Sequence, residues 1–376
     1  FSRVPFRNLT SGELAMTFTP FNRPKPRVLA SAVFLLLAAL SVSGNALAKD
    51  QFRIAWSIYV GWMPWDYAAE SGIVKKWADK YGIEIEVVQI NDYVESINQY
   101  TAGAFDGCVM TNMDALTIPA AGGVDSTALI IGDFSNGNDA VILRDKTELA
   151  EIAGQKVNLV ELSVSHYLLA RGLASVGLSE RDVTVVNTSD ADMVSAFASG
   201  GPTAVVTWNP LVSEILAMPN TAKVFDSSKI PGEIIDLMVV NTETLEANPA
   251  LGKALVGAWY ETMSIMSKDD EAGRAARTAM GKASGTDLAG YDAQLASTKM
   301  FFEPAEAVAF AKSEQLPLTM EQVASFSFDH GLLGEGAPNP GFIGVAFPGE
   351  RYFGDDGNLK LRFDAAYMQM AADGEL

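Results

Sequence analysis

A dense group of aromatic residues lies at positions 56–67, where the sequence reads WSIYVGWMPWDY. It contains three Trp and two Tyr, with Gly61, Pro64 and Asp66 between them. A glycine and a proline interrupt any regular element that would bury all these rings on one side. Because the segment follows a short apolar strand, we predict that it forms one wall of a ligand cleft. Such rings suit a solute that is small and either flat or cationic.

Residues that could hold a metal or act as a nucleophile are few and scattered. The two histidines are His166 and His330, and Cys108 is the single cysteine. They form no HxxxH or CxxC spacing, and the sequence contains no G-x-S-x-G or phosphate-binding loop. Cys108 lies in an apolar run at 107–110, which predicts a buried and inert thiol. The sequence therefore predicts no metal site, no catalytic residue and no cofactor.

Residues 1–48 have the pattern of an export signal with an upstream extension. Three basic residues between 23 and 27 precede an apolar run at 29–42, and Ala-Leu-Ala follows at 46–48. The run of 14 residues is shorter than the roughly 20 that a membrane-spanning helix needs. We expect cleavage after Ala48 and a mature chain in the periplasm.

The charge of the chain narrows the choice of partners. The net charge is −19, and removal of residues 1–48, which carry five basic residues and one acidic residue, brings it to −23. Nucleic acids and anionic membrane surfaces require a basic face, so neither is an expected partner. The negative charge is compatible with a cationic ligand, although solubility alone also explains it.

Strand-like runs alternate with helix-like runs along most of the chain. The expected strands are 52–56, 83–90, 107–110, 127–131, 140–144, 156–160, 183–187, 204–207, 223–226 and 237–241. The expected helices are 65–81, 93–102, 114–121, 165–175, 190–198 and 211–218. This alternation is typical of an α/β fold with mostly parallel sheets flanked by helices. From 249 onward the chain is expected to be mainly helical, with a Gly/Pro-rich loop at 334–349.

Two segments of the chain share one pattern, at 102–112 and 199–209. Each ends a helix with Gly, continues as a short apolar strand, and places Asn nine residues after the Gly. The match predicts two similar lobes, with strands 140–144 and 237–241 carrying the chain from one to the other. The expected boundaries are 49–139 for the first part of lobe 1, 140–236 for lobe 2, and 237–376 for the return to lobe 1 and a C-terminal helical region.

Together these features resemble the solute-binding proteins of ABC importers, in the branch that binds nitrate, taurine, alkanesulfonates and thiamine pyrimidines. The resemblance rests on the export signal, the aromatic turn after the first strand, the two lobes crossed twice and the A-G-x-x-D-G element at 102–107. Segment 61–140 is more similar still to the periplasmic binders associated with urea carboxylase, which are labelled as urea transporters. The resemblance implies a two-lobed, type II-like fold with two hinge crossings, which is not an enzyme. It also implies a small-molecule ligand and a partner permease in the inner membrane, and we expect a monomer.

In this family the ligand lies between the lobes, at loops that follow the carboxyl ends of strands, as it does in open α/β sheets generally. The positions that the resemblance implies for binding are Trp56, Ser57, Tyr59, Trp62, Thr111, Asn112, Asp114, Asn138, Asp139, Glu161, Ser163, Trp208 and Asp236.

These loops differ from what an anion would require. A nitrate or sulfonate favours Arg, Lys or bare helix N-termini, whereas these loops offer carboxylates and indoles. We expect Trp62 and Trp208 to enclose the ligand from the two lobes and Glu161 to act as a counter-ion, although Asp114 and Asp139 could equally cap turns or helices. The similar subgroup implies urea, whereas the loop chemistry favours guanidinium at least as strongly.

Other ligands remain open on the sequence alone. Taurine or another sulfonate, nitrate and a pyrimidine precursor are the alternatives that the wider family implies. Enzymes of thiamine-pyrimidine synthesis that share this fold depend on a cysteine-rich motif with histidine, which this chain lacks.

Overall fold

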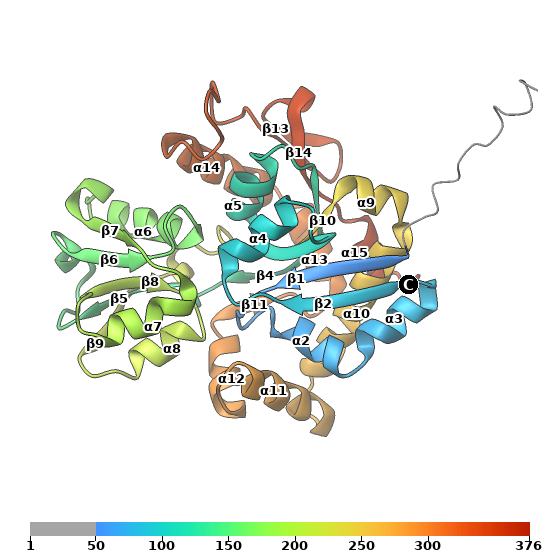
Figure 1. Ribbon diagram of the computed structural model, residues 1–376, viewed down its shortest axis with the longest axis horizontal. Helices are drawn as coiled ribbons and strands as arrows, with labels where there is room; N and C mark the ends of the chain where they lie inside the picture. Colours follow the sequence, from blue (N-terminus) through green and yellow to red (C-terminus); the bar gives the residue numbers. More distant parts are fainter. Residues whose placement is uncertain (1–49) are drawn as a thin grey trace, which may run out of the picture. The chain divides into compact units, whose positions relative to one another are not determined.

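The computed structural model describes residues 50–376, so the predicted export signal at 1–48 lies outside the described residues. The strands of the described part form two separate sheets, each flanked by helices (Figure 1). This arrangement confirms the predicted two-lobed α/β fold. We refer to the part built on the larger sheet as lobe 1 and to the part built on the smaller sheet as lobe 2. No helix within the described range is both long and apolar enough to cross a membrane.

The sheet of lobe 1 has the strand order β13-β12-β14-β4-β10-β3-β1-β2, with β11 paired to β4. Strand β1 is parallel to β2 and β3, whereas β10 runs antiparallel between β3 and β4. The strands are β1 (Gln51–Trp56), β2 (Glu84–Gln89), β3 (Gly107–Thr111), β4 (Ser126–Ser135), β10 (Ile235–Asn241), β11 (Thr298–Met300), β12 (Gly344–Phe347), β13 (Arg351–Phe353) and β14 (Leu359–Phe363).

The sheet of lobe 2 has the order β7-β6-β8-β5-β9. Strand β6 is parallel to both neighbours, whereas β5 is antiparallel to β8 and β9. The strands are β5 (Ala140–Arg144), β6 (Lys156–Leu159), β7 (Thr184–Asn187), β8 (Ala204–Thr207) and β9 (Thr221–Asp226). In both sheets, the strand that enters from the other lobe runs antiparallel to its neighbours, and β11 and β13 of lobe 1 also pair antiparallel. The sheets are therefore mixed, whereas the alternation alone predicts mostly parallel pairing.

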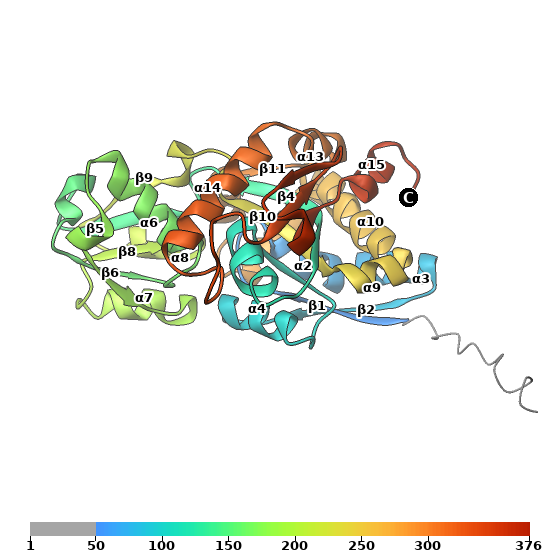
Figure 2. The same cartoon turned by 90° about the horizontal axis from the view of Figure 1, so that it is seen from above.

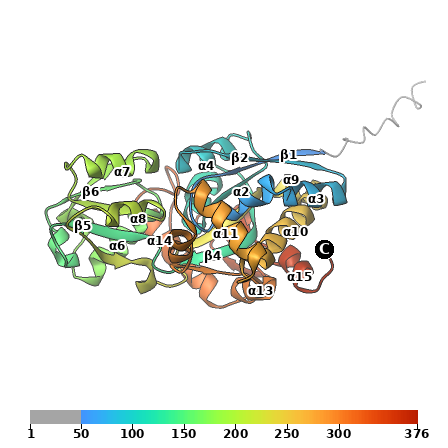
Figure 3. The same cartoon turned by 90° about the horizontal axis from the view of Figure 1, so that it is seen from below.

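Helices cover both sheets, and α6 and α7 lie on opposite faces of the sheet of lobe 2 (Figure 3). Lobe 2 contains α6 (Val164–Ser175), α7 (Asp190–Ala198) and α8 (Leu211–Leu216). Lobe 1 contains α2 (Met63–Glu70), α3 (Ile73–Tyr81), α4 (Tyr93–Thr101), α5 (Asn112–Ala115), α9 (Thr242–Ala247), α10 (Pro249–Met266), α11 (Glu271–Ala283), α12 (Leu288–Leu295), α13 (Pro304–Ala311), α14 (Gln315–Asp329) and α15 (Ala366–Ala372). The short turns are the π-helical η1 (Leu116–Ala120) and the 3-10 segments η2 (Leu149–Ile152), η3 (Glu180–Asp182), η4 (Ser227–Lys229) and η5 (Asp356–Asn358).

The structure differs from the expected elements in two places. The single helix expected at 65–81 is two helices, α2 and α3, because Gly72 between them adopts a left-handed conformation with φ of 78°. The C-terminal region is not only helical, since β12, β13 and β14 extend the sheet of lobe 1. These strands are three to five residues long and lie beside a Gly/Pro-rich loop, so their periodicity is too brief to read from the sequence.

The chain passes between the lobes twice, and an asparagine holds each crossing. At the second crossing, Asn112 donates from Nδ2 to the Glu233 carbonyl (3.2 Å) and accepts from the Ile235 N–H (3.0 Å). At the first, the Asn209 N–H donates to Asn138 Oδ1 (2.9 Å). Asn112 and Asn209 are the matching last residues of the two similar segments in the sequence. The shared pattern thus places one residue of each lobe at a crossing, although only Asn112 acts through its side chain, and the side chain at the first crossing is that of Asn138.

A close approach of α10 to α3 fixes one edge of lobe 1. A Cβ atom at Gly257 would lie 2.3–2.6 Å from ring atoms of Trp77, which is closer than any carbon contact allows. The helix pair therefore depends on glycine at this position.

We predict that Gly257→Ala lowers the free energy of unfolding by roughly 1–3 kcal/mol, because the added methyl group must displace the Trp77 ring. Chemical denaturation measures the change. The matched control is Gly201→Ala, whose nearest neighbouring atom would be Ser199 Oγ at 3.7 Å, and it should change stability by less than about 0.5 kcal/mol. Equal effects of the two substitutions would contradict the packing described here.

Candidate functional site

A small cavity of about 20 Å³ lies between the two lobes. Its walls come from loops at strand ends of both lobes, together with the N-termini of α4 and α6 and the two crossings. The lining residues are Tyr59, Trp62, Tyr93, Thr111, Asp139, Val164, Trp208, Ile234 and Asp236. A water molecule needs about 10–15 Å³ of such space, so the closed cavity holds only a molecule of very few atoms. A larger solute could enter only if the lobes part.

Four aromatic rings follow one another along the cavity. The ring centres of Tyr59 and Trp62 are 5.0 Å apart, those of Trp62 and Tyr93 are 5.5 Å apart, and those of Tyr93 and Trp208 are 5.7 Å apart. The first three rings belong to lobe 1 and Trp208 belongs to lobe 2. Rings therefore face the cavity from both lobes, as a flat or cationic ligand would require.

Direct hydrogen bonds join the lobes around these rings. Trp208 donates from Nε1 to the Ile58 carbonyl (3.2 Å), and the Val60 N–H donates to the Asn209 carbonyl (3.3 Å). The structure therefore shows the lobes in contact over the cavity.

Four aspartates are buried at or behind the cavity walls. Asp139 and Asp236 line it, Asp114 lies behind Tyr93 and Thr111, and Asp133 lies beside Asp236. Their side chains are at most 4% exposed. Among residues 50–376, none of the four forms an ion pair with Lys, Arg or His. The site therefore concentrates negative charge that no described side chain neutralises.

Hydroxyl groups donate hydrogen bonds to two of these carboxyl groups. Tyr93 donates to Asp114 Oδ2 (2.6 Å), and Thr111 Oγ1 donates to the same oxygen (2.9 Å). Tyr59 donates to Asp133 Oδ1 (2.9 Å). The other oxygens, Asp114 Oδ1 and Asp133 Oδ2, have no hydrogen-bond partner among the described residues. The carboxyl groups of Asp114 and Asp133 are thus only partly satisfied by hydroxyl groups.

Burial shifts the ionisation of all four groups in one direction. Desolvation raises the pKa of Asp114 to about 6 and the pKa of Asp133 and Asp139 to about 7. Desolvation and the charge of Asp133 raise the pKa of Asp236 well above its usual range. Asp133 and Asp236 are register partners on the antiparallel strands β4 and β10, so two like charges would lie directly opposite each other. A proton held by this pair relieves the repulsion.

A second small cavity, of about 10 Å³, lies behind the first and shares Trp62 and Asp236 with it. The Nε1 atoms of Trp62 and Trp259 are buried here without a hydrogen-bond partner in the described part of the chain. Together with the unpaired oxygen of Asp133, these groups provide two donors and one acceptor around a space of roughly the size of one water molecule.

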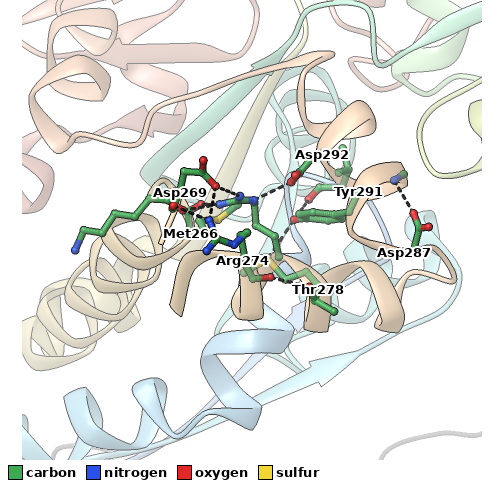
Figure 4. Close-up of polar contacts among 12 residues, drawn as sticks. Met266, Asp269, Arg274, Thr278, Asp287, Tyr291 and Asp292 are labelled. Atoms are coloured by element: carbon green, nitrogen blue, oxygen red, sulfur yellow. Dashed lines mark hydrogen bonds and ion pairs between the residues drawn. The ribbon is translucent and has the colours of Figure 1, made fainter. Parts of the chain in front are cut away.

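Helices α11 and α12 support the aromatic loop from outside the cavity. Tyr291 on α12 donates to the Val60 carbonyl (3.1 Å), which holds the loop after β1. The two helices are joined by Arg277, whose Nε donates to Asp292 Oδ1 (2.7 Å) and whose Nη1 donates to the Met266 carbonyl (2.6 Å), in the network drawn in Figure 4. Because these contacts occupy the guanidinium of Arg277, we interpret this region as structural.

The predicted binding residues fall into three groups. The structure brings six of them to the cavity: Tyr59, Trp62, Thr111, Asp139, Trp208 and Asp236. Six others are buried without lining it: Trp56, Ser57, Asn112, Asp114, Asn138 and Ser163. Of these, Asn112 and Asn138 hold the crossings and Ser163 caps α6 by accepting from the Ser165 N–H (3.2 Å). The last, Glu161, is exposed.

Glu161 does not reach the cavity, contrary to its predicted role as counter-ion. It lines a separate surface hollow of about 270 Å³, together with Asp92, Glu95 and Asp190. The chain turns outward after β6, and the Glu161 N–H donates to Asn187 Oδ1 (3.0 Å), which directs the side chain to solvent. Ser163 and Val164 then lead the chain back towards the cavity as α6 begins.

Sequence reasoning missed Tyr93, Val164 and Ile234 on the cavity wall and Asp133 behind it. Asp133 was missed because the predicted strand ended at residue 131, whereas β4 (STALIIGDFS) continues to Ser135 and buries this carboxylate, which is costly without a purpose. Tyr93 carried a weak signal, since it begins the helix that follows the end of β2. The other two are apolar residues with no distinguishing type.

Two solved structures share this architecture. The alkanesulfonate-binding protein SsuA of Xanthomonas axonopodis pv. citri, bound to MOPS, matches with a TM-score of 0.63 and 18% identity, over 77% of this chain and 96% of that one. The periplasmic nitrate-binding protein NrtA of Synechocystis PCC 6803 matches with a TM-score of 0.58 and 12% identity, over 78% and 84%. The fold is therefore that of the periplasmic solute-binding proteins.

Sequence comparison gives the family. Residues 55–280 match the NMT1-like family, and the chain belongs to it. A protein of Brucella abortus (strain 2308) named "Putative binding protein" is 24% identical over 212 residues, which cover 54% of this chain and 63% of that relative's length.

The raised pKa of Asp133 predicts how stability depends on pH. An unfolded Asp ionises near 3.9, whereas the folded group ionises near 7, so the folded state binds more protons between these values. Stability of the ligand-free protein should therefore fall as pH rises from about 4 to 7. The amide introduced by Asp133→Asn cannot ionise, so the stability of this variant should fall less than that of the wild type as the pH rises. We expect the variant to gain roughly 1–4 kcal/mol relative to the wild type between pH 4 and pH 8.

Chemical denaturation at a series of pH values tests this expectation. Glu161→Gln is the matched control, because it removes an exposed carboxylate and should leave the pH profile unchanged. A wild-type profile that rises through this range, or the same profile for Asp133→Asn, would contradict the burial argument.

Proposed function

We propose that this chain is the substrate-binding component of an ABC importer and that it captures a small, nitrogen-rich cation between its lobes in the periplasm. Guanidinium is the ligand that we favour. One observation carries the proposal: two buried aspartates line the cavity and two more lie behind its walls, none of them with a cationic partner among residues 50–376, and four aromatic rings follow one another along it.

The chemistry of the cavity supports a planar cation over a neutral solute. Guanidinium carries N–H donors around its edge and delocalised positive charge on its faces, so carboxylates can bind the edge while indole rings cover the faces. Urea, which the similar urea-carboxylase-associated binders suggest, has a similar size and shape but no charge to neutralise the aspartates. We therefore propose urea as a weaker ligand of the same cavity.

The same chemistry opposes an anion. The two solved relatives are an alkanesulfonate binder and a nitrate binder. None of the residues lining this cavity is Lys or Arg, and two are Asp. An anion would have to approach these carboxylates, which raises its free energy in the site unless every one of them is protonated. Sulfonates, nitrate and pyrimidine precursors remain alternatives for the binding assay to decide.

We propose a transport role in which the lobes close on the ligand and the closed form delivers it to a permease in the inner membrane. The residues that contact the ligand would come from both lobes, so binding favours the closed arrangement. The cavity-lining residues Asp139 and Ile234 belong to the two crossings, so ligand contact and hinge position would be coupled directly. We expect the mature chain to act as a monomer and not to catalyse a reaction.

We predict that Asp139→Asn weakens guanidinium binding by roughly 2–5 kcal/mol, because it removes a charge-assisted hydrogen bond in a desolvated site. Binding of urea should weaken much less. Calorimetric titration of residues 49–376 with guanidinium, urea, taurine and nitrate measures both effects. Glu161→Gln serves as the control and should bind all ligands as the wild type does. Tighter wild-type binding of urea, taurine or nitrate than of guanidinium would refute the cation site.

We further predict that Trp208→Ala weakens ligand binding at least about tenfold, because it removes the one ring that lobe 2 places against the cavity and also the hydrogen bond to Ile58. Trp77→Ala is the control, since Trp77 lies on α3 away from the cavity. The affinity of this variant for the ligand should equal that of the wild type. Circular dichroism confirms that both variants are folded at the assay temperature. Unchanged affinity of the Trp208 variant would mean that the ring serves only lobe packing.

A further inference from the structure

A second group of titratable side chains meets at the boundary between the lobes, outside the cavity. His166 lies in the first turns of α6 and Glu180 in η3, both in lobe 2, whereas His330 ends α14 of lobe 1. The possible ligand atoms of these three residues all lie within 4.8 Å of one another. His330 Nε2 is 2.7 Å from Glu180 Oε2, and His166 Nε2 contacts Glu180 Oε1. Figure 2 shows α14 along the boundary between the lobes.

The ring of His330 is held with Nε2 towards this cluster. Its Nδ1 lies 2.8 Å from the Phe326 carbonyl, which can only accept, so Nδ1 carries a proton. The Phe326 ring is 4.0 Å away and tilted by 31°, which limits rotation of the imidazole. A backbone carbonyl on one ring nitrogen is the usual support for a histidine that binds a metal through the other.

The ring of His166 is also held with Nε2 towards the cluster. Its side chain is 6% exposed, and its Nε2 contacts Glu180 Oε1. Its Nδ1 accepts from the Leu162 N–H (3.1 Å). Metal binding at Nε2 would move the ring proton to Nδ1, which could then no longer accept the hydrogen bond from the Leu162 N–H.

We propose that His166, Glu180 and His330 bind a divalent transition metal of the zinc type at the boundary between the lobes. Two imidazoles and one carboxylate are a common ligand set for Zn²⁺, with a water molecule in the fourth position. The side chains of Glu180 and His330 are 31% and 20% exposed, which leaves access for the ion and for that water. Tetrahedral ligands lie about 3.3 Å apart around Zn²⁺. To accept the ion, the Glu180–His330 pair (2.7 Å) would have to separate by about 0.6 Å, and ligand atoms as far apart as 4.8 Å would have to draw closer.

The position of this site gives it a mechanical consequence. Two ligands come from lobe 2 and one from lobe 1, so the complete set exists only when the lobes are closed. A bound ion would therefore favour the closed form and strengthen binding in the cavity, and the ligand in the cavity would strengthen metal binding by the same factor.

The test uses residues 49–376 without an affinity tag, because a histidine tag would bind the same metals. Addition of Co²⁺ should produce the visible absorption of a tetrahedral site at one ion per chain, and Zn²⁺ should displace it. His330→Gln and His166→Gln should each weaken Co²⁺ and Zn²⁺ binding at least about tenfold. Arg171→Gln, which breaks the neighbouring ion pair with Glu233, is the control and should retain metal binding.

The outcomes separate this proposal from the proposed function, because metal binding is measured without any ligand in the cavity. Loss of the cobalt absorption in both histidine variants supports the site. Absence of that absorption in the wild type, or binding that persists in His166→Gln, overturns it and assigns any bound metal to surface carboxylates. Circular dichroism excludes unfolding as the cause, and Glu180→Gln provides a third variant should either histidine substitution unfold the chain.

Discussion

Four carboxyl groups are buried at or behind the cavity without an ion-pair partner among residues 50–376, and the surrounding structure responds to this constraint. Removing a carboxylate from water costs several kcal/mol unless a partner compensates. Hydroxyl groups of Tyr59, Tyr93 and Thr111 compensate in part, because each donates to one of the aspartates. The remainder is met by proton uptake, which is the physical meaning of the raised pKa values. Binding of a cation to these carboxylates would therefore be coupled to the release of those protons.

The position of these aspartates follows from how the chain crosses between the lobes. Strand β10 enters the sheet of lobe 1 antiparallel, between β3 and β4, and this places Asp236 opposite both Thr111 and Asp133. Asp139 ends the other crossing, directly before β5. The polar ends of the crossing strands and the walls of the cavity are therefore the same residues. A change of charge in the cavity acts directly on the segments about which the lobes would move, with no chain of intermediates to transmit it.

Sequence reasoning succeeded where regular patterns decide the structure. The alternation of apolar runs located the strands from β1 to β10, although not β11 to β14, and the rule that ligands bind at the carboxyl ends of strands identified six residues of the cavity wall. It failed where the outcome depends on the direction of a single turn. Glu161 and Asp139 both lie at strand ends, yet the backbone after β6 turns Glu161 outward while the crossing holds Asp139 inside. Nothing in the residue types near these positions distinguishes the two cases.

Contacts between residues far apart in the chain could not be predicted from the sequence for a different reason. The histidines are 164 positions apart in the sequence and show no metal-binding spacing, so their meeting at Glu180 depends on α14 reaching lobe 2. Asp133 shows the converse. A carboxylate within an apolar strand is costly wherever the chain leads, so its presence indicates a purpose before any contact is known. The sequence did not reveal it here, because the predicted strand ended at residue 131, whereas β4 continues to Ser135 and buries Asp133. An acidic residue near the end of an apolar run is therefore informative only once the end of the strand is known, since a turn of the backbone after β6 leaves Glu161 in solvent.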